Sequence, residues 1–100
     1  MQSREEVIQA LRVALPRLAS EYGVKRIGLF GSFARGTQER DSDIDLLVEF
    51  ERPIGLKFVE LAESLEELLG HKTDVLTPDG LKGIRVERVA SDIQESVLYV

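Results

Sequence analysis

Residues 26–50 read RIGLFGSFARGTQERDSDIDLLVEF, and this stretch decides the fold. An apolar run ends at Gly31-Ser32, and a second apolar run opens with acidic residues at alternate positions, Asp43 and Asp45. Successive side chains of a strand point to opposite faces, so both acids should share one face, where like charges repel each other. Another interaction must therefore offset that repulsion.

The composition is that of a small soluble protein. The chain has 100 residues, of which 43% are hydrophobic and 31% are charged, and this predicts one globular domain over residues 1–100. The formal net charge of −5 argues against direct nucleic-acid binding, because phosphate recognition needs a basic surface. The sequence contains no cysteine, and its apolar runs are shorter than a membrane span. We expect a cytoplasmic protein without membrane association.

Apolar periodicity and turn residues predict the element order α-β-turn-β-α-β-α. A first helix is expected from Ser3 to about Leu15, with Pro16 kinking or restarting it and Gly23 ending it. Strands are expected at residues 24–30, 43–50 and 72–77, and further helices at residues 56–69 and 81 to about 96. We expect the apolar end, residues 97–100, to pack locally. The predicted class is α/β (α+β), with a mixed sheet of about three to four strands packed against helices.

The turn after the first strand has the features of a phosphate site. Gly31 has no side chain, so the backbone can approach a phosphate closely. A short helix beginning at Ser32 would add free N–H groups and a hydroxyl as donors. Arg35, one turn further along, can reach the same anion with its forked guanidinium. These residues predict a site for a nucleoside triphosphate.

The alternating acids have the features of a divalent-metal site. Asp43 and Asp45 should lie about 6–7 Å apart on one strand face, where ions can bridge them. Two-metal phosphoryl-transfer sites hold their ions roughly 3.5–4 Å apart. For a third carboxylate, Asp74 is favoured over Asp79 and over Glu49, which should lie about 13 Å beyond Asp45. The lone histidine, His71, is expected to be exposed and without a role.

These motifs carry a family resemblance. Gly31-Ser32, ten intervening residues and Asp43-x-Asp45 resemble the signature of nucleotidyltransferases related to DNA polymerase beta. The fuller pattern, LFGSFARG followed by DSDIDLLVEF, resembles the minimal nucleotidyltransferase (MNT) branch, and HKTDVLT stands where that branch has its third acid. The resemblance implies a polymerase-beta-like fold. It implies catalytic and metal-binding roles for Asp43, Asp45 and Asp74, and nucleotide-binding roles for Gly31, Ser32 and Arg35.

The resemblance also implies a partner. Similar stand-alone domains of bacteria and archaea are typically antitoxins paired with a HEPN toxin, an RNase encoded nearby. The implied reaction transfers AMP from ATP to a toxin tyrosine and so neutralises the toxin. Two Mg²⁺ ions are expected, with Mn²⁺ as a substitute. Two alternatives stay open: a non-catalytic antitoxin that acts by occlusion, and a stand-alone nucleotidyltransferase that acts on a small molecule or RNA.

Overall fold

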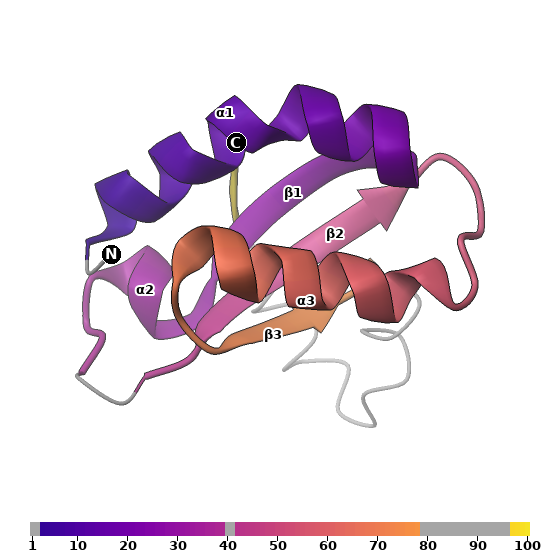
Figure 1. The fold of residues 1–100 in the computed structure, drawn as a ribbon. Helices are drawn as coiled ribbons and strands as arrows, with labels where there is room; N and C mark the ends of the chain where they lie inside the picture. Colours follow the sequence, from indigo (N-terminus) through magenta and orange to yellow (C-terminus); the bar gives the residue numbers. More distant parts are fainter. Residues whose placement is uncertain (1–2, 40–41, 79–96) are drawn as a thin grey trace.

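The computed structural model describes residues 3–39, 42–78 and 97–100. Over these residues the elements are α1 (Arg4–Tyr22), β1 (Val24–Phe30), α2 (Gly31–Arg35), β2 (Ile44–Phe50), α3 (Lys57–Leu69), β3 (Thr73–Leu76) and β4 (Leu98–Tyr99), as Figure 1 shows. The helix predicted at residues 81 to about 96 lies outside the described residues. No helix in the described part of the chain has the length and apolar character needed to cross a membrane.

Helix α1 is continuous, so it does not restart at Pro16. Proline has no N–H, so the Arg12 carbonyl lacks its usual helical hydrogen bond from residue 16. Pro16 and Arg12 are both exposed, and water can therefore donate to that carbonyl oxygen. The expected cap is present, because Ser3 Oγ accepts a hydrogen bond from the Glu6 N–H at 3.2 Å. The helix ends at Gly23, which has φ of 71°.

The strands form one mixed sheet in the order β3-β2-β1-β4. Strand β1 pairs antiparallel with β2 and β4, while β2 and β3 are parallel and are connected through α3. The apolar residues 97–100 pair with β1 as a fourth strand, in which Val97 and Val100 pack against the hydrophobic clusters while Leu98 and Tyr99 stay exposed. Gly28 makes room there, because a Cβ at this position would lie 2.0 Å from Val97 Cγ1.

The main hydrophobic core lies between one face of the sheet and the helices α1 and α3, which cover the same side in Figure 1. Its strand residues include Ile44, Leu46 and Val48, which alternate along β2. A smaller cluster on the opposite face centres on Phe30 and Leu47. Because Asp45 alternates with the core residues, it belongs to this second face, outside the helix-covered core.

Candidate active site

The Gly31 turn is built around the Asp45 carboxylate. Phe30, the last residue of β1, pairs with Asp45 in β2, so the chain turns directly beside that side chain. Gly31 has φ of 74°, and a Cβ at this position would lie 2.2 Å from Asp45 Oδ2. Only glycine therefore permits this backbone conformation and leaves the carboxylate in place.

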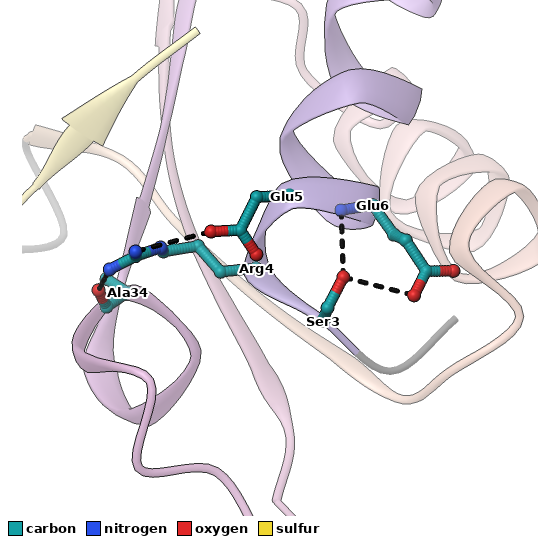
Figure 2. Close-up of polar contacts among 5 residues, drawn as sticks. All are labelled: Ser3, Arg4, Glu5, Glu6 and Ala34. Atoms are coloured by element: carbon teal, nitrogen blue, oxygen red, sulfur yellow. Dashed lines mark hydrogen bonds and ion pairs between the residues drawn. The ribbon is translucent and has the colours of Figure 1, made fainter.

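Helix α2 begins at Gly31 and is held near its C-terminal end. The Arg4 guanidinium of α1 donates to the Ala34 carbonyl oxygen at 3.1 Å and pairs with Glu5 at 3.3 Å (Figure 2). The first turn of α2 has no side-chain cap, so its N–H groups are not bonded by a capping side chain. The half-buried Ser32 lies in this first turn.

The three acids favoured from the sequence lie at neighbouring positions. Asp45 is directly opposite Asp74 in the parallel register of β2 and β3, and Asp43 comes one residue before β2. Burial raises the pKa of Asp45 above its usual value, and repulsion from Asp74 and Asp43 raises it further, while Arg35 opposes the shift. The repulsion expected from the sequence is thus present in the structure.

Asp43 lies between two contacts with the turn that precedes β3. The Ile44 N–H donates to the Lys72 carbonyl at 3.0 Å, and Lys72 Nζ lies 3.9 Å from Asp43 Oδ2. On the other side, His71 Nε2 is hydrogen-bonded to the Ser42 carbonyl oxygen. The predicted exposure of His71 was wrong: the side chain is half-buried because it packs against this loop and against Phe33.

The remaining candidates lie apart from this group. Glu49 forms an ion pair with Arg26 further along the sheet, so it does not join the other acids. Asp79 lies outside the described residues. The exposed Arg35 acts on Asp45 through its charge and makes no hydrogen bond to it among the described contacts. Sequence reasoning missed the contacts that His71 makes with Ser42 and Phe33.

The donor chemistry of this site suits a divalent cation, because the neighbouring carboxylates of Asp43, Asp45 and Asp74 supply the oxygen ligands that Mg²⁺ prefers. Within residues 3–39, 42–78 and 97–100, however, no three Asp, Glu or His side chains form a ready-made metal cage. Mg²⁺ is usually bound by one or two carboxylates together with substrate phosphates and waters. The arrangement therefore fits an ion that binds together with a nucleotide.

The comparisons with known proteins identify the family of this chain. The chain belongs to the nucleotidyltransferase domain family, which matches it over residues 11–100. It is 41% identical over 101 residues to the protein adenylyltransferase MntA of Thermococcus cleftensis, a match that covers 100% of this chain and 98% of the relative. The resemblance to the MNT branch is thus confirmed at the level of the family.

Solved structures agree on the fold. A structure assigned as a minimal nucleotidyltransferase has a TM-score of 0.75 and 33% identity, covering 97% of this chain and 95% of its own. A toxin–antitoxin structure with AMP-PNP has a TM-score of 0.62 and 26% identity, covering 96% of this chain and 70% of its own. The predicted fold class, a mixed sheet packed against helices, is confirmed.

Proposed function

We propose that this domain is an antitoxin that transfers AMP from ATP to a tyrosine of a partner HEPN RNase toxin. The observation that carries the proposal is the pairing of Asp45 with Asp74 directly beside the Gly31 turn. It brings candidate metal-binding carboxylates next to backbone N–H groups suited to phosphate. Similarity along the whole chain to a protein named as a protein adenylyltransferase supports transfer to a protein acceptor.

In this proposal each site residue has a distinct role. Gly31 and Ser32 hold phosphate oxygens of ATP, and the Arg35 guanidinium stabilises the same anion. Asp43 and Asp45, with Asp74, hold Mg²⁺, for which Mn²⁺ can substitute. When bound, the metal neutralises the charge of the phosphates. Of the three acids, Asp74 is the exposed one, so an incoming acceptor can reach it.

The proposed reaction is an adenylyl transfer. The tyrosine oxygen forms a bond to the α-phosphorus of ATP, the bond to pyrophosphate breaks, and the hydroxyl proton passes to a carboxylate. Asp74 is our candidate acceptor for that proton. We assign its neighbour Asp45 to metal binding beside the phosphates, because the Asp45 carboxylate lies against the Gly31 turn.

The partner is proposed from the similarity to a toxin–antitoxin structure and from the MNT resemblance. We expect the toxin gene to lie beside the gene for this protein. The test is incubation of the purified domain with that toxin, Mg²⁺ and ATP labelled in the α-phosphate, followed by denaturing electrophoresis. Label on the toxin, absent when Mg²⁺ is chelated, is the expected result. Label on RNA or on a small molecule would favour a stand-alone enzyme instead.

A further inference from the structure

The turn between α3 and β3 contacts the segments that carry the proposed site residues. His71, in this turn, bonds the carbonyl oxygen of Ser42, the residue before Asp43. Its ring also lies edge-on to Phe33, the residue after Ser32, with ring centroids 5.8 Å apart and an interplanar angle of 67°. We propose that His71 is a positioning residue that holds Asp43 in its metal-binding place, an inference that rests on the metal site of the proposed function.

The hydrogen bond restrains Asp43 through the backbone. A carbonyl oxygen can only accept, so His71 Nε2 must carry the proton and donate to Ser42. The Ser42 carbonyl belongs to the planar peptide group that ends at the Asp43 Cα. Holding that oxygen therefore opposes the peptide rotation that would swing the Asp43 carboxylate away from Asp45.

The histidine itself is held on a rigid support. The buried Thr73 donates through Oγ1 to the His71 carbonyl at 3.0 Å, which closes the turn on itself. The Gly70 N–H donates to the Glu66 carbonyl at 2.8 Å and ties the turn to the end of α3. The Ile44 N–H donates to the Lys72 carbonyl, and His71 bonds Ser42, so the turn is hydrogen-bonded to the chain on both sides of Asp43.

The contact with Phe33 sets the direction of the imidazole. Phe33 is 1% exposed and is fixed in the main core, so its ring provides a firm surface for the edge of His71. The hydrogen-bond donor and the aromatic ring of His71 can thus be tested separately by substitution. His71→Gln keeps a donor at a similar reach and loses the aromatic ring, whereas His71→Phe keeps a ring and loses the donor.

The test measures Mn²⁺ binding to the full chain by electron paramagnetic resonance in the presence of AMP-PNP, without any partner. We expect His71→Phe to weaken Mn²⁺ binding about tenfold, the lower end for losing a group that holds a metal ligand in place. His71→Gln should bind Mn²⁺ within about threefold of the wild type. In AMP transfer at limiting Mg²⁺, His71→Phe should raise the KM for ATP, because the ion and the nucleotide bind together.

Tyr22→Phe is the matched control. It removes another part-buried tertiary hydrogen bond, from Tyr22 to Glu60 at 3.4 Å, between α1 and α3. This variant should lose stability comparable to that lost by His71→Phe while binding Mn²⁺ like the wild type. If His71→Phe also bound Mn²⁺ like the wild type, or if His71→Gln were no better than His71→Phe, the positioning role would be wrong. A wild-type domain that bound no Mn²⁺ would instead refute the proposed metal site, and the role of His71 with it.

Discussion

The ionisation of the Asp45 carboxyl depends on its neighbours. Its carboxylate is half-buried, lies against the Gly31 backbone and faces two other acids, so the charged form is disfavoured without a counter-ion. Asp45→Asn should therefore increase the free energy of unfolding of the metal-free domain and weaken Mg-ATP binding on the order of tenfold or more. Urea denaturation and a titration with a fluorescent ATP analogue measure the two effects.

Glu49→Gln is the control for that substitution, because Glu49 lies on the same strand and pairs with Arg26. It should leave Mg-ATP binding intact. Weakened stability in Asp45→Asn together with unchanged Mg-ATP affinity would show that Asp45 has a structural role only.

The raised pKa of Asp45 also predicts a pH dependence. Between the ordinary carboxyl pKa, about 3.9, and the raised value in the folded state, the folded protein binds more protons than the unfolded chain. Its stability should therefore fall as pH rises through that window, and Asp45→Asn should lack this component. The stability difference between variant and wild type, measured in chelator from about pH 4 to 8, should grow with pH and then level off. A difference independent of pH would argue against the raised pKa.

Gly31 and Gly55 form a matched pair for testing the turn. Both have positive φ, 74° and 57°, but a Cβ at Gly55 would meet no atom within 4 Å, whereas one at Gly31 would collide with Asp45. Gly55→Ala should cost about 1–2 kcal/mol from backbone strain alone and should bind Mg-ATP normally. Gly31→Ala should cost more and should lose Mg-ATP binding. Equal effects in the two variants would mean that the contact with Asp45 is unimportant.

At the scale of elements, α2 depends on its anchor to α1. Arg4→Ala removes the bond to the Ala34 carbonyl and should weaken nucleotide affinity about two- to fivefold, since a partly exposed charged contact is worth at most about 1 kcal/mol. Arg17→Ala is the control, because Arg17 forms a similar ion pair with Glu21 in α1, also at 3.3 Å. If both variants bound nucleotide equally well, the anchor would not matter for the site.

Local pattern was sufficient to predict most elements. The bounds of β1 were predicted, and β2 differs by one residue, because apolar runs between turn residues define strands without reference to the rest of the chain. Strand β4 was not predicted as a strand, since its two residues form one only by pairing with Gly28 and Leu29 far away in sequence. The continuity of α1 through Pro16 likewise depends on solvent exposure, which the local sequence does not specify.

Some contacts of the site were predicted and others were not, because contacts between residues far apart in the sequence are not specified by local pattern. The proximity of Gly31 to the acidic strand follows from an antiparallel pair whose strands are consecutive in the sheet and are joined by residues 31–43. Choosing among Asp74, Asp79 and Glu49 required the register of a parallel pair joined through α3, and the structure places Asp74 opposite Asp45. The contacts of His71 cross from one turn to another loop, and no sequence periodicity reports such a contact.

At the scale of the whole molecule, the fold decides from which side an acceptor reaches the candidate site. The helices α1 and α3 cover one face of the sheet, and the candidate site lies at the edge of the opposite face. Among the described residues, Asp74 is exposed there, where an acceptor hydroxyl can approach. A tyrosine presented by another protein fits this arrangement, and occlusion without chemistry is the rival explanation.

The most direct test exposes an excess of the toxin to a small molar fraction of this domain with ATP and Mg²⁺, then measures toxin mass and RNase activity. A catalyst acts repeatedly, whereas an occluding partner can silence only as many toxin chains as it occupies. The account predicts an inactive toxin that is heavier by one or more AMP groups, and no such change with the Asp43→Asn, Asp45→Asn domain. Neutralisation by that double variant mole for mole with the wild type, with no mass added to the toxin, would contradict it.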